Sequence, residues 1–135
     1  ATTEVEHCLN DVPFIADLCV YGVEVPGADG RCGMVSFTLK PDYTKDTVDW
    51  QLFHKECLAH LPAYARPLFV RIMTELPQTV TFKPQKNKMV SDGYSLAAAA
   101  ESDNATVYRY VPKDGSVHAV TQQEVEQINA GKIKL

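Results

Sequence analysis

The 135-residue sequence has no long hydrophobic run, no Cys-x-x-Cys pair and no excess of basic residues. A membrane-spanning helix needs about 20 apolar residues, and a signal peptide needs a basic start before an apolar stretch, so the sequence predicts neither. The 13 Lys and Arg against 17 Asp and Glu leave a net charge of −4. This balance argues against a general nucleic-acid binder, because phosphate affinity depends on uncompensated positive charge. We expect one soluble domain that buries a core without metal or disulfides.

The sequence also has no glycine-rich phosphate loop and no initiating Met. The turn region between residues 27 and 33 carries Arg31 in place of the Gly-Lys-Ser/Thr that cradles nucleotide phosphates. We therefore expect this chain alone to bind ATP weakly or not at all, and we expect it to begin within a longer protein.

The cysteines and histidines do not form a recognisable site. The cysteines are widely separated, each within an apolar pattern: Cys8, Cys19, Cys32 and Cys57. Without a signal peptide, buried thiols in a reducing compartment are a better interpretation than a secreted disulfide set. His54, Cys57 and His60 have helical spacing, but the outer pair lies about 240° apart around a helix. The sequence predicts no metal site.

The first 40 residues predict a helix and a hairpin. Thr3 and Glu6 are spaced as a capping box for a helix that ends before Pro13. Residues 15–25 and 31–40 alternate on either side of a glycine-rich turn, which predicts two antiparallel strands.

The next segment predicts a helix, an extended linker and a third strand. An apolar stripe at three- and four-residue steps predicts a helix over residues 46–61. Prolines predict an extended segment over 61–67, since each removes an amide donor. Residues 68–73 predict a strand before a polar loop from 75 to 88. We expect an α+β fold: a small antiparallel sheet, made of the hairpin plus a further strand, flanked by helices.

The composition changes after Gly93. Residues 95–106 are rich in Ala and Ser, typical of one short helix or a linker, and residues 107–120 predict a second small hairpin. Thr121 and Glu124 predict the start of a last helix that ends at Gly131. We expect a domain over residues 1–94 and an extension over 95–135.

Two groups of residues have both a structural and a functional interpretation. Lys83 has Lys86 and Lys88 close by, and spacing alone favours a solvated basic face over a catalytic lysine. Glycines recur around the hairpin turn, where tight turns and close approach of a ligand require glycine for the same reason. The residues concerned are Gly22, Gly30, Arg31 and Gly33.

Four blocks of sequence, in a fixed order, form a distinctive set: residues 2–6, 20–34, 61–69 and the Thr-Phe-Lys triplet at 81–83. The tail adds Val111-Pro112 and the last five residues, Gly-Lys-Ile-Lys-Leu. Together these blocks closely resemble the C-terminal domain of the fatty acid transport protein and very-long-chain acyl-CoA synthetase family, within the adenylate-forming superfamily. The Phe-Lys pair, in place of the wider superfamily's Gly-Lys, is similar to the transport-protein branch.

The resemblance implies a fragment of an enzyme that works in two steps. Relatives first join a fatty acid to ATP and then use coenzyme A to displace AMP, and the small domain swings between the steps. By resemblance, Lys83 is the adenylation lysine, and Gly22, Gly30, Arg31 and Gly33 are candidates for the coenzyme A or nucleotide side. The resemblance also implies that ATP, Mg²⁺, coenzyme A and fatty acid bind in the full-length enzyme, with a missing N-terminal adenylation domain as partner, and that none binds this fragment alone.

Two other functions stay open at this point. One is a binding or transport-coupling module without chemistry of its own, and the other is a freestanding α+β domain. The resemblance implies an intracellular protein whose membrane association, at the endoplasmic reticulum or a peroxisome-like organelle, resides in the missing part. The sequence predicts no nucleic-acid partner.

Overall fold

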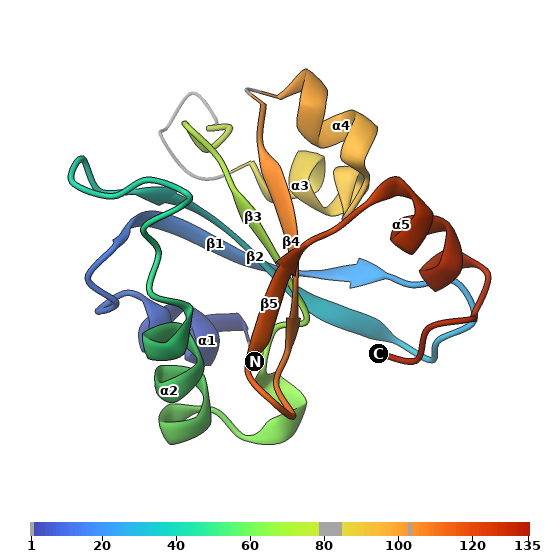
Figure 1. Ribbon diagram of the computed structural model, residues 1–135, viewed down its shortest axis with the longest axis horizontal. Coiled ribbons are helices and arrows are strands. Elements are labelled where there is room, and N and C mark those ends of the chain that lie inside the picture. The colour runs from blue at the N-terminus through green and yellow to red at the C-terminus, as the bar shows by residue number, and fades with distance from the viewer. Residues whose placement is uncertain (1, 79–84, 103) are drawn as a thin grey trace.

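Five strands form one mixed sheet with helices on both faces (Figure 1). The computed structural model describes residues 2–78, 85–102 and 104–135. The strands are β1 (Ile15–Glu24), β2 (Arg31–Leu39), β3 (Phe69–Ile72), β4 (Thr106–Val111) and β5 (Ser116–Ala119), in the order β1-β2-β3-β4-β5. The helices are α1 (Thr2–Leu9), α2 (Trp50–His60), the 3-10 helix η1 (Ala63–Ala65), α3 (Lys86–Asp92), α4 (Leu96–Glu101) and α5 (Gln122–Asn129).

The pairing of the strands confirms the α+β class and changes one detail of the expected sheet. β1 and β2 form the predicted antiparallel hairpin, with Gly22 opposite Gly33. β3, however, pairs with β2 in parallel, from Met34 opposite Phe69 to Phe37 opposite Ile72. The sheet is therefore mixed and not purely antiparallel, because α2 carries the chain across one face before it returns as β3.

Separate hydrophobic cores lie on the two faces of the sheet. On one face α1 and α2 cover an aromatic cluster in which Phe37 lies 5.9 Å from Phe14 and 6.5 Å from Trp50, between ring centroids. On the other face α3, α4 and α5 cover a second cluster, in which Phe69 stacks on Tyr94 at 4.5 Å. Because both faces are covered, all four residues of β3 are buried.

Two predicted helix starts differ from the observed ones. α2 begins at Trp50 and not near residue 46, because the Asp49 side chain caps it by accepting a hydrogen bond from the Leu52 amide at 3.0 Å. The capping box at Thr3 is wrong, since α1 already includes Thr2 and the Glu6 carboxylate instead accepts from the Val20 amide at 3.4 Å.

The proline-bracketed segment and the polar loop also differ from expectation. Residues 63–65 form η1 where an extended chain was expected, although the flanking Pro62 and Arg66 are extended. α3 occupies the end of the predicted polar loop and was not predicted. Met89 is the one buried residue among the seven of this helix, so its sequence shows no helical repeat of apolar residues.

The C-terminal elements agree with the sequence. The short helix α4, the hairpin β4–β5 and the capped helix α5 are all present, and the Glu124 amide donates to Thr121 Oγ1 at 3.2 Å. β4 pairs with β3, so strands from both sides of the boundary after residue 94 share one sheet. The division of the chain at that boundary stays a prediction.

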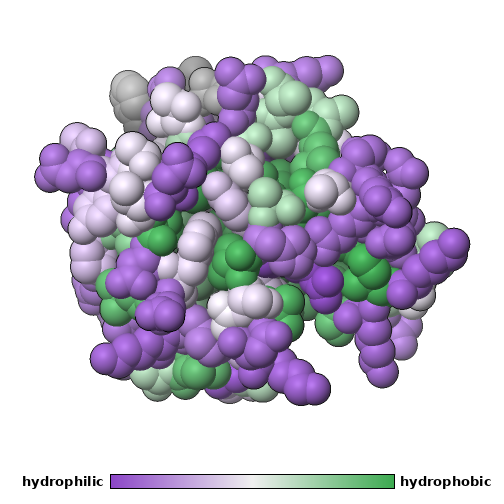
Figure 2. Space-filling view, viewed as in Figure 1, coloured by the Kyte–Doolittle hydropathy of each residue, from purple (hydrophilic) through white to green (hydrophobic). Residues whose placement is uncertain are grey.

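The surface is mostly polar on the face drawn in Figure 2, with hydrophobic residues visible near its centre and over the alanine-rich α4. Across residues 2–78, 85–102 and 104–135, no helix has both the length and the hydrophobicity to cross a bilayer.

Phe37→Ala tests the packing between the sheet and α2. Phe37 is fully buried, so we expect a loss of about 3–5 kcal/mol in the free energy of unfolding from lost burial and the residual cavity. Leu58→Ala on the exposed side of α2 is the matched control, with an expected change within about 0.5 kcal/mol. Urea titration followed by circular dichroism measures both, and equal losses would contradict this core.

Candidate functional site

Two glycines face each other across the β1–β2 hairpin near its turn. Gly22 pairs directly with Gly33, so neither strand places a side chain at this level. A Cβ built on Gly22 would lie 3.1 Å from the Cβ of Arg31, whose Nη1 donates to the Gly22 carbonyl oxygen at 3.4 Å. The side-chain stem of Arg31 therefore occupies the space beside Gly22, which favours glycine at this position.

The proline-bracketed segment lies beside this pair of glycines. The Leu68 amide donates to the Gly33 carbonyl oxygen at 2.9 Å, and a Cβ on Gly33 would meet the Pro67 Cα at 3.4 Å. Arg66 Nε donates to the Leu61 carbonyl oxygen at 3.1 Å, which ties the two ends of η1 together. These contacts hold Tyr64 beside the hairpin with 82% of its surface exposed.

Between the β1–β2 hairpin and the proline-bracketed segment lies a groove of about 160 Å³, which we call the hairpin groove. Its lining includes Val5, Gly22, Arg31, Gly33, Tyr64 and Pro67. The lining is mainly apolar, and it includes the Arg31 guanidinium and the exposed aromatic ring of Tyr64. Such a channel suits a slender chain with a charged end.

Three of the four predicted coenzyme-side residues converge in this groove: Gly22, Arg31 and Gly33. The fourth, Gly30, lies in the hairpin turn with a φ of +76°, so the backbone conformation there favours glycine. Lys83, the predicted catalytic lysine, lies outside the residues that the structure describes.

The described residues that flank Lys83 lie at the other end of the sheet. β3 runs parallel to β2 and leaves the sheet after Ile72, where the Met73 amide donates to the Phe37 carbonyl oxygen at 2.9 Å. From Gly33 to Phe37, β2 extends over about 13 Å. Beyond this end, the Gln85 amide donates to the Pro77 carbonyl oxygen at 2.8 Å, which brings the two flanks together.

The thiols and phenols near the groove have raised pKa values. Burial raises the pKa of the Cys32 thiol, which lines the groove, and burial raises the pKa of Cys57 to about 12. Burial also raises the pKa of Tyr21 to about 12, and its hydroxyl shares a hydrogen bond of 2.6 Å with Ser36. These groups are protonated at neutral pH and are poor nucleophiles or bases there.

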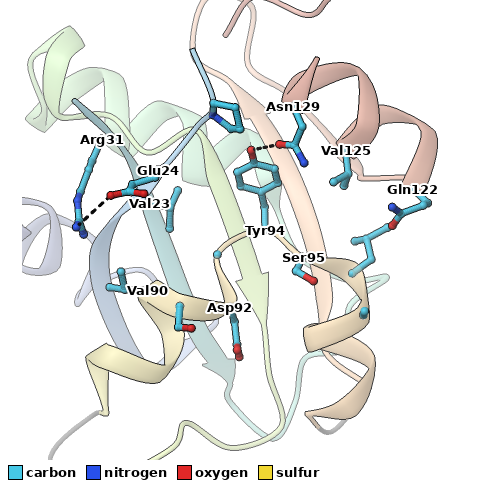
Figure 3. Close-up of a pocket in the computed structure, with 15 residues that line it drawn as sticks. Val23, Glu24, Arg31, Val90, Asp92, Tyr94, Ser95, Gln122, Val125 and Asn129 are labelled. Carbon is cyan, nitrogen blue, oxygen red and sulfur yellow. Dashed lines mark hydrogen bonds and ion pairs between the residues drawn. The ribbon is translucent and has the colours of Figure 1, made fainter. Parts of the chain in front are cut away.

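A larger cleft of about 600 Å³ lies between the hairpin, the junction of α3 and α4, and α5 (Figure 3). Tyr94 donates to Asn129 Oδ1 at 2.5 Å across it, and Arg31 pairs with Glu24 at 3.7 Å on its rim (Figure 3). Of the predicted site residues, Arg31 alone lines both this cleft and the hairpin groove.

Sequence reasoning did not identify the residues outside the hairpin that line the groove. Tyr64 and Pro67 were interpreted as parts of a fixed linker, and no periodicity connects them with the glycines. The two prolines that bracket Tyr64 are the one available indication, since they hold that segment rigid. Within the described parts of the chain, no group of three or more His, Cys, Asp or Glu side chains is arranged to hold a metal ion.

The sequence match identifies the class of protein to which this fold and groove belong. The family model for the AMP-binding enzyme C-terminal domain matches residues 4–83, more than half of the chain. The chain therefore belongs to the AMP-binding enzyme C-terminal domain family.

Among curated proteins, the chain is similar to fatty acid transport proteins and to a bacterial ligase. It is 36% identical to long-chain fatty acid transport protein 6 of Homo sapiens over 100% of this chain and 21% of that protein. It is 38% identical to a medium/long-chain-fatty-acid–CoA ligase of Mycobacterium tuberculosis over 70% of this chain and 15% of the ligase. The chain thus spans about a fifth of the length of these relatives.

Solved structures of CoA ligases share the fold. The anthranilate CoA ligase AuaEII, in complex with anthranoyl-AMP, matches with a TM-score of 0.62 and 30% identity over 73% of this chain and 19% of that chain. A Mycobacterium tuberculosis fatty acyl CoA synthetase matches with a TM-score of 0.59 over 71% of this chain and 18% of that one, and at 21% identity it supports the fold alone.

Thiol reactivity tests the burial of the cysteines. At about pH 8 we expect a maleimide to modify the half-buried Cys8 and Cys32 slowly, and the buried Cys19 and Cys57 after unfolding only. Mass spectrometry of peptides, with and without denaturant, measures each site. Rapid labelling of Cys57 in the folded chain would contradict its raised pKa.

Proposed function

We propose that this chain is the mobile C-terminal domain of an ATP-dependent long- or very-long-chain fatty acyl-CoA ligase. Its family membership and its likeness to a fatty-acid–CoA ligase support this proposal. Because the chain spans about a fifth of its relatives, we assign the ATP and fatty-acid pockets to an N-terminal adenylation domain outside it. Fatty acid, ATP and coenzyme A are then substrates of the whole enzyme.

The separation of two surfaces along the sheet is the observation that carries the proposal. The hairpin groove lies at the amino end of β3, and the flanks of Lys83 lie beyond its carboxyl end. A domain built in this way can present one end to a reaction centre, turn, and then present the other. Two successive reactions at one centre can use such an arrangement.

In the first reaction, a fatty-acid carboxylate oxygen attacks the α-phosphorus of ATP, the bond to the β-phosphate oxygen breaks, and pyrophosphate leaves. Negative charge accumulates around the α-phosphate, and a positioned Lys83 ammonium stabilises that charge. Mg²⁺ would accompany the ATP phosphates, whose pocket we assign to the N-terminal domain.

In the second reaction, the coenzyme A thiol loses its proton, its sulfur attacks the acyl carbonyl carbon, and the carbon–oxygen bond to AMP breaks. The hairpin groove is where we place the slender pantetheine arm, because its lining is narrow and mainly apolar, with Arg31 among its residues. Arg31 supplies positive charge for the coenzyme phosphates, Gly30 shapes the turn beside it, and the exposed Tyr64 ring offers a stacking surface.

A transport-coupling module is the second candidate, favoured by the names of the fatty acid transport protein relatives. In that role the domain would contribute no residue to chemistry, and variants would alter uptake without altering thioester synthesis. We assign any membrane association of the full-length protein to its other parts.

Lys83→Ala separates the two half-reactions in the full-length protein. We expect acyl-adenylate formation, measured by pyrophosphate release, to fall at least about 10²-fold, as for other removed charge-stabilising groups. Thioester formation from supplied acyl-adenylate should change little. Normal adenylation by the variant would contradict the proposed role of Lys83.

Gly22→Val makes the reciprocal test, because Gly22 lines the groove and a side chain there would displace the groove residue Arg31. We expect thioester formation from supplied acyl-adenylate to slow about 10- to 100-fold while adenylation is retained. Ala28→Val also introduces a valine, in the exposed hairpin turn outside the hairpin groove, and is the control. If both variants leave the second step unchanged, the groove does not hold coenzyme A.

A further inference from the structure

A buried arginine joins β3 to α3 on the face of the sheet that α3 covers. Arg71 has 1% of its surface exposed, and its Nη1 lies 3.1 Å from Oδ2 of Asp92, the last residue of α3. The same carboxylate oxygen lies 3.4 Å from Lys88 Nζ, which is half exposed. One carboxylate therefore holds the buried guanidinium on one side.

The rest of the guanidinium has no acceptor in the part of the chain that the structure describes. Arg71 Nε and Nη2 are buried and have no hydrogen-bond partner among the described residues. Ser36, the register neighbour of Arg71 on β2, shares its hydroxyl with Tyr21 at 2.6 Å. Buried N–H groups without acceptors destabilise the folded state, so an arginine at this position lowers the free energy of unfolding.

Stability alone gives no reason for an arginine here. A well-packed apolar residue at a buried ion-pair position is commonly neutral or stabilising relative to the pair. What an ion pair adds is a defined geometry: charge-assisted contact fixes the end of α3 against one residue of β3. Arg71 leaves two buried donors without partners and still fixes the end of α3, and this combination favours a role in positioning over a role in stability.

The pair also joins the two elements that flank the segment carrying Lys83: Arg71 lies on the strand before it, and Asp92 ends the helix after it. β3 leads into this segment and α3 follows it, and the Pro77–Gln85 hydrogen bond closes it between them. α3 has a second tie, Lys86 Nζ to Glu6 at 3.4 Å, but both side chains are partly exposed and solvent weakens that pair. The Arg71–Asp92 pair is the buried ion pair, among the described residues, between the strand before the segment and the helix after it.

We infer that Arg71 and Asp92 are positioning residues for adenylation, which fix α3 against β3 and so fix both anchors of the segment that carries Lys83. The inference rests on the proposed role of Lys83. Arg71 itself touches no substrate; it acts through the placement of its neighbours.

The test uses the full-length enzyme with Arg71→Met and Asp92→Asn. We expect the kcat of adenylation to fall about 10- to 100-fold, as for a reacting group displaced by about 1 Å. The rate of thioester formation from supplied acyl-adenylate should stay within about two-fold, because the hairpin groove lies at the other end of the sheet. Combining Arg71→Met with Lys83→Ala should cause little loss beyond that of Lys83→Ala, since coupled residues are not additive.

Arg109→Met is the matched control. Arg109 forms a comparable half-buried pair with Glu124 at 3.3 Å, between β4 and α5, and does not flank the Lys83 segment. We expect it to leave adenylation unchanged. If Arg71→Met does not fold, the double variant Arg71→Met/Asp92→Leu takes its place in the same assays. This variant removes both charges together and leaves no unpaired buried charge.

Three results would overturn the inference. They are unchanged adenylation in the Arg71 or double variant, an equal fall in both half-reactions, and an equal effect of Arg109→Met. If Lys83→Ala itself leaves adenylation intact, the proposed function fails first, so the two failures are distinguishable.

Discussion

The parallel pairing of β2 with β3 is the constraint on which the rest of the structure depends. It makes α2 a crossover on one face, packs that helix on the aromatic cluster around Phe37, and leaves β3 free to pair with β4 on its other side. Because β2 is also one strand of the hairpin, the same pairing sets Gly33 beside Pro67. A one-residue shift of register would turn Phe37 from the core under α1 and α2 to the opposite face of the sheet. The same shift would remove the contact between Gly33 and Pro67.

The direction of β3 then distributes function along the sheet. Parallel strands bring their amino ends together, so the start of β3 meets the hairpin at the groove, and its carboxyl end carries the chain away toward residue 83. On the second face, α3 holds this far end in place through Met89 and the Arg71–Asp92 pair. One small sheet thus connects two surfaces that we assign to two chemical steps.

The local sequence pattern predicted most helices and strands, but it did not predict the pairing of strands that are distant in sequence. The hairpin followed from alternation around a glycine-rich turn, and α5 followed from the Thr121 cap. The parallel pairing was not predicted, because it joins segments about 35 residues apart in sequence and no local periodicity records it. α3 was missed because its core contacts are two adjacent residues, the buried Met89 and the partly buried Val90, which give no helical period. The glycines of the groove were found through family resemblance, whereas Tyr64 became part of the site through its position in space alone.

Covalent footprinting of the full-length enzyme tests the central claim, that opposite ends of this domain serve successive steps. Radical oxidation reports on the exposed Tyr64, and acetylation reports on Lys86 and Lys88. With a stable acyl-adenylate analogue we expect the lysines to be protected and Tyr64 to stay reactive. After addition of a coenzyme A analogue we expect the reverse. Protection of the same end in both states would contradict the account.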